Sequence, residues 1–173
     1  YLPLRRFAKS EIVPSNKDRF LRKETLQGFV HDEASAFFGG LAGNAGLFST
    51  ARDVARVYQM LLNGGEIDGQ RYLSKETCQL FTTETSKISR RGLGFDKPDA
   101  DDPKKGNCAP AAPAEVYGHT GFTGTCAWVD PMNELVYVFL SNRIYPDVTN
   151  RKLSRLEIRE QIQDAIYKAI QSK

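Results

Sequence analysis

The sequence predicts an α+β fold, in which an antiparallel sheet carries a packed C-terminal helix and is joined to part of a helical region. Three observations support this prediction: apolar residues recur at helical spacing between 51 and 81, two apolar strand patterns flank a turn at 130–133, and residues 153–170 form an amphipathic pattern. Helices followed by a hairpin and a terminal helix are the order expected of an α+β domain.

The composition is that of a globular domain. Of the 173 residues, 40% are hydrophobic and 26% are charged, values that exclude long disorder and fibrous repeats. The length suits one domain with its own core. No apolar run approaches the ~20 residues of a membrane helix, so no membrane span is expected. The net charge of +3 implies no partner by itself.

Residues 1–28 are predicted to be a basic lead-in segment. Residues 1–30 show no clean hydrophobic period and predict irregular structure with a short helix. Seven cations against two anions give residues 1–23 a local charge of +5. A solvated segment is favoured over a patch for an anionic partner, since no nucleic-acid-binding motif accompanies the charge. We therefore expect no nucleic acid to bind.

A loop and two helices are expected next. Residues 39–46 hold four glycines and predict a tight loop, but they lack the Lys-Ser/Thr ending of a phosphate loop, so nucleotide binding is not expected. Apolar residues at helical spacing predict a helix that Ser49 or Thr50 can cap and that ends at the Asn-Gly-Gly sequence of 63–65. After a turn at Asp68-Gly69, Ser74 is expected to cap a second, shorter helix.

The second half of the sequence predicts a loop, then strands and a terminal helix. Residues 96–115 mix four prolines with charges and predict a long, Pro-rich surface loop within a single domain. Residues 117–125 are glycine-rich and are expected to be extended. Residues 126–129 and 135–140 predict an antiparallel hairpin, with the second strand apolar on both faces like a covered central strand. One long amphipathic helix is expected over 153–170.

The cysteines and histidines do not predict a metal site. Cys78, Cys108 and Cys126 form no Cys-x-x-Cys pair, and the chain has two histidines, so neither zinc nor another cofactor is expected. Cys126 is expected to be a small core residue, with a catalytic cysteine as the alternative. The cluster at 31–33, His-Asp-Glu, is expected to order a loop through hydrogen bonds to backbone, with a place at the rim of a site as the alternative.

The segment Gly118–Thr125, with the sequence Gly-His-Thr-Gly-Phe-Thr-Gly-Thr, carries the strongest chemical signal. The His119 imidazole can act as a base or bind a carboxylate, and the Thr120 hydroxyl can hydrogen-bond an anion. Gly121 removes a side chain, so that a ligand can lie against the strand. The alternative is a glycine-rich turn with a surface histidine.

This segment resembles the third motif of the serine β-lactamase and penicillin-binding protein superfamily, in which Lys-Thr-Gly is often replaced by His-Thr-Gly. Other segments resemble, in the same order, the class C β-lactamases and related esterases over residues 29–170. These segments are 30–34, 39–43, 45–50, 61–65, 91–95 (Arg-Gly-Leu-Gly-Phe, similar to the strand before the third motif), 128–131, and 141–143 with Tyr145-Pro146.

The resemblance implies an acyl-enzyme mechanism and gives roles to individual residues. His119 would assist proton transfer or carboxylate recognition, Thr120 would bind the substrate carboxylate, and Gly121 would give clearance. The backbone N–H of Phe122 would supply half of an oxyanion hole. Asn142 would lie at the carboxylate end of the pocket.

The motifs that would supply the nucleophile are absent from residues 1–173. There is no Ser-x-x-Lys, Tyr-x-Asn or Ser-x-Asn sequence. The chain is therefore expected to be the C-terminal portion of an incomplete domain, inactive alone. The other half of the domain, or another copy of the chain, is an expected partner, because the missing half contributes strands to the sheet.

The leading hypothesis is the C-terminal part of a serine hydrolase of the bacterial periplasm or cell envelope. Its substrates would carry an amide, ester or peptidoglycan-type peptide bond. The alternative is a non-catalytic module that binds cell-wall peptides or docks within a larger envelope enzyme.

Overall fold

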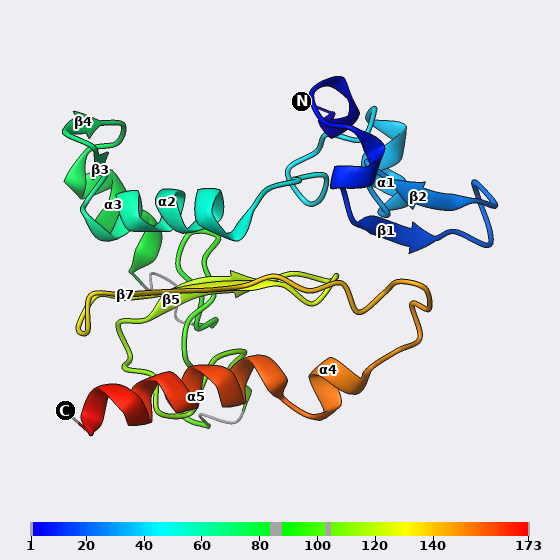
Figure 1. The fold of residues 1–173 in the computed structure, drawn as a ribbon. Helices are drawn as coiled ribbons and strands as arrows, with labels where there is room; N and C mark the ends of the chain where they lie inside the picture. Colours follow the sequence, from blue (N-terminus) through cyan, green and yellow to red (C-terminus); the bar gives the residue numbers. More distant parts are fainter. Residues whose placement is uncertain (1, 84–87, 103–104, 173) are drawn as a thin grey trace. The chain divides into compact units, whose positions relative to one another are not determined.

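The computed structural model describes residues 2–83, 88–102 and 105–172 (Figure 1). The chain divides into two compact units. Unit 1 comprises residues 1–50 and 141–152, and unit 2 comprises residues 51–140 and 153–173. The His-Thr-Gly segment belongs to unit 2.

A three-stranded antiparallel sheet forms the centre of unit 2. Its strands are β5 (Tyr117–Thr120), β6 (Cys126–Asp130) and β7 (Leu135–Phe139), in the order β5-β6-β7. The predicted hairpin is confirmed as the β6–β7 pair. Its turn is held by the Asp130 carboxylate, which accepts hydrogen bonds from the backbone N–H groups of Met132 and Asn133.

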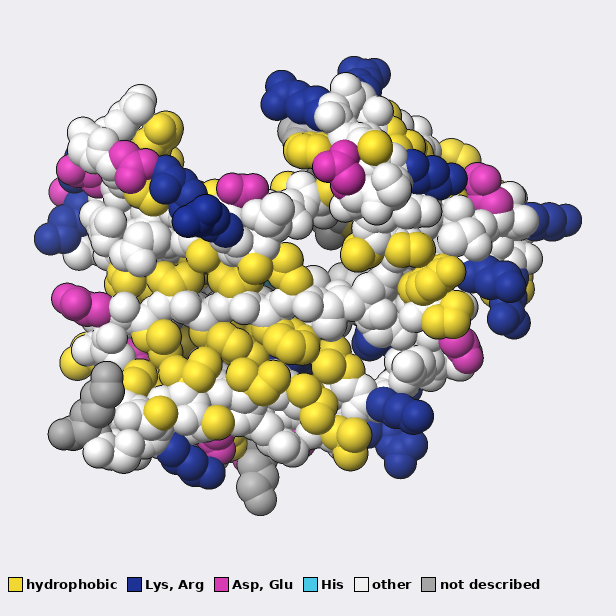
Figure 2. Space-filling view, in the orientation of Figure 1, with side chains coloured by type: hydrophobic (Ala, Val, Ile, Leu, Met, Phe, Trp, Pro, Cys, Tyr) yellow, Lys and Arg dark blue, Asp and Glu magenta, His cyan; other side chains and the backbone are white. Residues whose placement is uncertain are grey.

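Helices cover both faces of this sheet, so the predicted α+β class is confirmed for unit 2 (Figure 1). Helix α2 (Ala51–Leu62) packs on β6 and β7, and α5 (Ile158–Gln171) lies on the opposite face. On the α5 side the core contains Trp128 and Tyr137. Figure 2 shows hydrophobic side chains on both sides of the backbone band of β7, toward α2 and toward α5.

The position of β7 corrects one prediction. All five residues of β6 are buried, whereas β7 is mostly half-buried. The strand order makes β6 the central strand and leaves β7 at an edge of the described sheet. The apolar character of β7 on both faces therefore reflects the two helices that flank the sheet, since no second strand neighbour of β7 lies in the described residues.

The two predicted helices of unit 2 are confirmed, with the expected ends. Gly65 (φ 94°) donates its N–H to the carbonyl of Met60, which closes α2 with a Schellman motif. The ribbon of β3 (Glu66–Ile67) and β4 (Gln70–Arg71) turns at Asp68-Gly69, as predicted. Ser74 caps α3 (Lys75–Thr82) by accepting a hydrogen bond from the N–H of Thr77.

The terminal helix differs from the prediction. A short α4 (Lys152–Arg155) precedes α5, and Glu157 between them has a left-handed backbone with φ 47°. A left-handed residue interrupts a right-handed helix, so the amphipathic pattern is divided into two helices.

Unit 1 holds a ribbon where irregular structure was predicted. Its elements are the 3-10 helices η1 (Pro3–Arg5) and η2 (Lys9–Glu11), the antiparallel strands β1 (Pro14–Lys17) and β2 (Thr25–Gln27), and helix α1 (Glu33–Phe37). Asp32 caps α1 by accepting from the N–H of Ser35 at 2.7 Å, so the predicted loop-ordering role is confirmed for Asp32. The sequence did not predict this strand pair, because both strands are short and mostly polar and show no alternation of apolar and polar residues.

The loop between β1 and β2 is ordered by one buried carboxylate. Asp18 accepts hydrogen bonds from the N–H groups of Phe20, Leu21 and Arg22, and its Oδ2 lies 2.5 Å from Nε of Arg22. The hydrogen bond from Arg22, opposed by burial and assisted by the backbone donors, lowers the pKa of Asp18 to about 2. Asp18 therefore stabilises the folded loop above pH ~4 and loses that effect as the pH falls toward 2.

We expect Asp18→Ala to loosen this loop, because three backbone donors and a guanidinium lose their acceptor. Loss of a buried partner costs about 1–3 kcal/mol, so the amide hydrogens of residues 20–22 should exchange about tenfold faster or more at pH 7. Asp147→Ala is the control, since that carboxylate serves a different turn of unit 1. Unchanged exchange at residues 20–22 would contradict the role given to Asp18.

The Pro-rich stretch 96–115 is more buried than a surface loop. Asp96, Lys97, Cys108 and Ala109 are buried, and the backbone N–H of Ala109 donates to Oε1 of Gln163 in α5. This stretch therefore contributes to the core of unit 2. None of the helices in the described ranges is long and apolar enough to cross a membrane.

Candidate functional site

The predicted motif residues lie at the end of β5 and in the turn that follows it. His119 is exposed and Thr120 is half-buried at the last two positions of the strand. Gly118 precedes them at a close approach of two strands: a Cβ there would lie 2.1 Å from the backbone oxygen of Ala127. The absence of a side chain at Gly118 allows β5 to pair closely with β6.

Beyond Thr120 the chain turns instead of staying extended to residue 125. The N–H of Gly121 donates to the carbonyl of Thr125, and the N–H of Gly124 donates to that of Gly121. A Cβ on Gly121 would lie 2.3 Å from Oγ1 of Thr125. A side chain at Gly121 would therefore require the Thr125 hydroxyl to move, and the clearance for a ligand stays a prediction. Phe122 occupies the turn with a side chain that is 60% exposed.

The outer edge of β5 has a neighbour at Asp96. The N–H of Gly118 donates to the Asp96 carbonyl at 3.0 Å, and the N–H of Asp96 donates to the Gly118 carbonyl at 2.7 Å. The segment 91–95, which resembles a strand, forms no strand; only Asp96 makes an isolated bridge. The turn of 92–95, in which the N–H of Gly92 donates to the carbonyl of Phe95, ends the pairing before it can extend.

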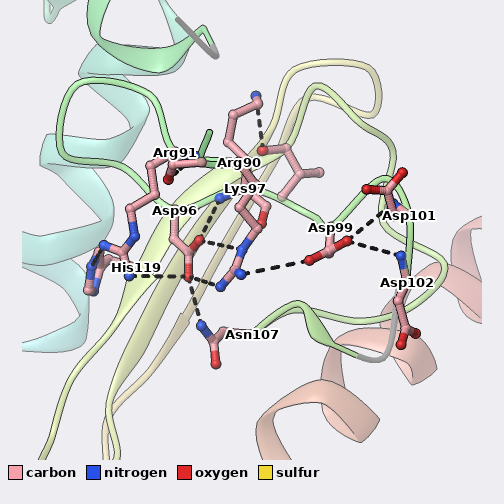
Figure 3. A network of polar contacts seen from close by, with 11 residues as sticks. Arg90, Arg91, Asp96, Lys97, Asp99, Asp101, Asp102, Asn107 and His119 are labelled. Atoms are coloured by element: carbon pink, nitrogen blue, oxygen red, sulfur yellow. Dashed lines mark hydrogen bonds and ion pairs between the residues drawn. The ribbon is translucent and has the colours of Figure 1, made fainter. Parts of the chain in front are cut away.

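Both ring nitrogens of His119 have polar partners. Nε2 lies 2.8 Å from Nη1 of Arg91 (Figure 3). Nδ1 lies 2.6 Å from the carbonyl oxygen of Thr120. The imidazole is therefore held between a guanidinium and the strand itself.

A network, which we call the Asp96 cluster, lies beside the imidazole. It consists of Arg90, Arg91, Asp96, Lys97 and Asn107 (Figure 3). The buried Asp96 carboxylate accepts from Nε of Arg90 at 2.8 Å, from Nη2 of Arg90 at 3.1 Å and from Nδ2 of Asn107 at 2.7 Å. The bidentate pair with Arg90 orients this carboxylate.

Arg91 lies between the Asp96 carboxylate and His119. Its Nη2 is 3.9 Å from Oδ2 of Asp96, and its Nη1 contacts the imidazole. Burial raises the pKa of Asp96, but hydrogen bonds from Arg90 and Asn107 and the charges of Arg90 and Arg91 lower it more. The net effect is a pKa below the usual range of an aspartic acid, so Asp96 is ionised at neutral pH.

The Lys97 side chain links the start of the 96–115 stretch to its end by hydrogen bonds. Its Nζ donates to the carbonyl oxygens of Thr82 at 3.3 Å, Glu115 at 3.4 Å and Val116 at 3.3 Å. The loop is thus closed immediately before β5, which fixes the strand that carries His119.

Asn142 belongs to unit 1. Its Nδ2 donates to the carbonyl oxygens of Pro14 and Ser15, and its Oδ1 accepts from the N–H of Ile144 at 3.3 Å. The side-chain amide therefore braces β1 within unit 1. Its predicted place at the carboxylate end of a pocket stays a prediction.

The cysteines do not offer a nucleophile. Cys78, Cys108 and Cys126 are all buried and unbridged. Burial raises the pKa of the Cys108 thiol to about 12 and that of Cys126 to about 11. A thiol that stays protonated at neutral pH is a poor nucleophile, which argues against the catalytic-cysteine alternative. Within the described ranges, no three His, Cys, Asp or Glu side chains are grouped so that they could hold a metal ion.

Comparison with known proteins gives the family. Residues 7–160 match the Beta-lactamase family. The chain belongs to this family. The putative D-alanyl-D-alanine carboxypeptidase of Escherichia coli (strain K12) is 37% identical to this Beta-lactamase family member over 131 residues, 75% of the chain and 30% of that protein. Proteins of the same name from Salmonella agona (strain SL483) and Salmonella typhi are 36% identical over 135 residues, 78% of the chain and 31% of theirs.

Family membership confirms the resemblance drawn from the motifs. The Beta-lactamase family chain spans about a third of the length of the curated relatives it matches. The role of Arg91 and Asp96 was not predicted. Arg91 and His119 are separated by 28 positions, so no local pattern links them. The one available signal was that Arg91 begins a segment that itself resembles the family.

Proposed function

We propose that the chain is the C-terminal part of a serine hydrolase that forms an acyl-enzyme on peptidoglycan-type peptides ending in D-alanine. A segment outside residues 1–173 would supply the nucleophile, because no Ser-x-x-Lys sequence is present. The observation that carries the proposal is the His-Thr-Gly sequence at the end of β5, in a chain whose relatives are named D-alanyl-D-alanine carboxypeptidases.

The residues would act as follows. Thr120 would hydrogen-bond the substrate carboxylate, and the N–H of Phe122 would stabilise the oxyanion that forms during acyl transfer. His119 would orient the carboxylate or move a proton. Gly121 would keep the strand end clear of a side chain, and Asn142 would contribute at the carboxylate end.

The position of β7 at an edge of the sheet favours a partner that adds a strand to it. β7 ends the described sheet, and within the described residues it pairs with β6 alone, so its other edge has no strand partner there. An edge strand presents unpaired backbone N–H and C=O groups, which favour pairing with another strand. The first half of the domain would pair there, and another copy of the chain is the alternative occupant. Action on peptidoglycan would locate the protein in the periplasm or cell envelope.

The test is intact-protein mass spectrometry after incubation with a reactive penicillin. We expect no covalent adduct on residues 1–173 alone and one adduct on the longest natural polypeptide that contains them, with release of D-alanine from a peptide ending in D-Ala-D-Ala. An adduct on residues 1–173 alone would mean that a residue of this chain is the nucleophile.

The non-catalytic alternative has a separate outcome. If the longest polypeptide gives neither an adduct nor D-alanine but binds the peptide, the chain is part of a cell-wall peptide-binding module. Hydrolysis of a simple ester without D-alanine release would instead identify an esterase.

A further inference from the structure

We propose that Arg91 is a positioning residue for His119: its guanidinium donates a hydrogen bond to Nε2 and thereby holds the imidazole as its neutral Nδ1–H tautomer. The geometric part stands on the contacts within unit 2. The part that concerns hydrolysis rests on the proposed function, so the two are tested by separate measurements.

The first step follows from the chemistry of the guanidinium. Arginine has N–H donors and no acceptor, so the 2.8 Å contact with Arg91 requires Nε2 of His119 to accept. The ring proton must then be on Nδ1. Nδ1 lies 2.6 Å from the carbonyl oxygen of Thr120, which is an acceptor. Both contacts are satisfied by one tautomer of the neutral ring and by no other state.

The second step is that Arg91 itself is held. Its Nη2 lies 3.9 Å from Oδ2 of Asp96, and Asp96 is fixed by Arg90 and Asn107. The backbone of Asp96 is also paired with Gly118, next to His119 in β5. The guanidinium therefore lies within ion-pair distance of a fixed carboxylate at the same edge of the strand as the imidazole.

The third step concerns what this arrangement does to His119. The imidazole is exposed, and an exposed side chain ordinarily samples several rotamers. Hydrogen bonds at both nitrogens restrict the ring to one orientation at the end of β5, beside Thr120. In the proposed reaction the Nδ1–H would serve the substrate carboxylate or a moving proton in place of the Thr120 carbonyl, while Arg91 keeps the ring in position. Such positioning matters, because a misplacement of about 1 Å can cost on the order of 10²-fold in rate.

Nitrogen-15 NMR of the imidazoles in the 173-residue chain tests the geometry. The chain has two histidines, so His31→Gln assigns the signals. At pH 8, where an ordinary imidazole is neutral, we expect the ring proton of His119 on Nδ1. The Nε2 signal should move downfield in Arg91→Met, because the hydrogen bond is lost, and should move less in Arg91→Lys, which keeps a donor.

Arg56→Met is the matched control, since it removes another exposed arginine of unit 2, one paired with Asp68. It should leave the His119 signals unchanged. A ring proton on Nε2 in the unmodified chain would overturn the proposal, and this result does not depend on any variant folding. An Nε2 signal that is the same in Arg91→Met and the unmodified chain would also overturn it.

The consequence for hydrolysis is measured on the longest natural polypeptide. Arg91→Met should slow acylation by penicillin between about tenfold and a hundredfold, with partial recovery in Arg91→Lys and no change in Arg56→Met. Normal acylation in Arg91→Met would overturn the positioning role, whatever the NMR result. Absence of any adduct on the unmodified polypeptide would overturn the proposed function, and the NMR result would still decide the tautomer.

Discussion

Asp96→Ala is expected to lower the free energy of unfolding of unit 2 by about 3 kcal/mol. Removing one partner of a buried ion pair costs about 3–5 kcal/mol, because the remaining charge is left without compensation. The loss of unfolding free energy should be at the lower end of that range, because the Arg90 side chain is 27% exposed and can be partly hydrated. Asn107 and the backbone N–H of Lys97 lose the same acceptor.

Trp128 provides the measurement. It is the single tryptophan of the chain and lies in the core of unit 2, so its fluorescence during urea unfolding reports this unit. Asp101→Ala is the control, because that exposed side chain lies in the same stretch, and its effect should stay within about 0.5 kcal/mol. Equal unfolding curves for the two variants would rule out a stabilising role for the Asp96 cluster.

The Asp96 prediction also has a pH dependence of known sign. Burial raises the pKa of Asp96, yet its hydrogen bonds and cationic neighbours leave that pKa below the usual range. A depressed pKa stabilises the fold above the unfolded value of about 3.9, and the effect disappears as the pH falls below it. The difference in unfolding free energy between the unmodified chain and Asp96→Ala should therefore shrink below pH ~4.

The fold of unit 2 was predictable where hydrophobic periodicity was strong. The 51–62 helix has a clear helical period, and the 126–140 hairpin consists of two apolar runs around a turn. The residues that create these patterns are the ones through which the helix and the hairpin pack on each other. The break at Glu157 was not predictable, because a left-handed glutamate leaves no compositional signal. The β1–β2 ribbon depends on partners far along the chain, such as Asn142, which donates to the carbonyl of Ser15.

The candidate site was predictable in one part only. Residues 119–122 are contiguous, so their chemistry is visible in the sequence. The Asp96 cluster is assembled from a turn at 90–97 and from Asn107, positions that tertiary structure alone brings to β5. The prolines of 96–115 predicted a surface loop, but proline content does not report that Asp96 and Cys108 are buried.

His119→Ala is expected to slow acylation of the longest natural polypeptide by about 10²–10⁴-fold. That is the typical contribution of a group that moves a proton in the transition state. The time course of the penicillin adduct measures the rate. His31→Ala is the matched control, because His31 precedes the Asp32 cap in unit 1, and we expect it to react normally. A slowed His31→Ala would favour the alternative that 31–33 lies at the rim of the site.

Combining the variants separates the two residues. If Arg91 acts through His119, Arg91→Met should slow the unmodified enzyme but have little further effect on His119→Ala, because there is no imidazole left to orient. The two losses would then be far from additive. Additive losses would instead mean that Arg91 contributes independently of His119, for example by attracting the substrate carboxylate. An acylation rate unchanged by His119→Ala would mean that His119 has no role in the reaction. Of the polar groups proposed at the end of β5, the Thr120 hydroxyl and the Phe122 N–H would then remain.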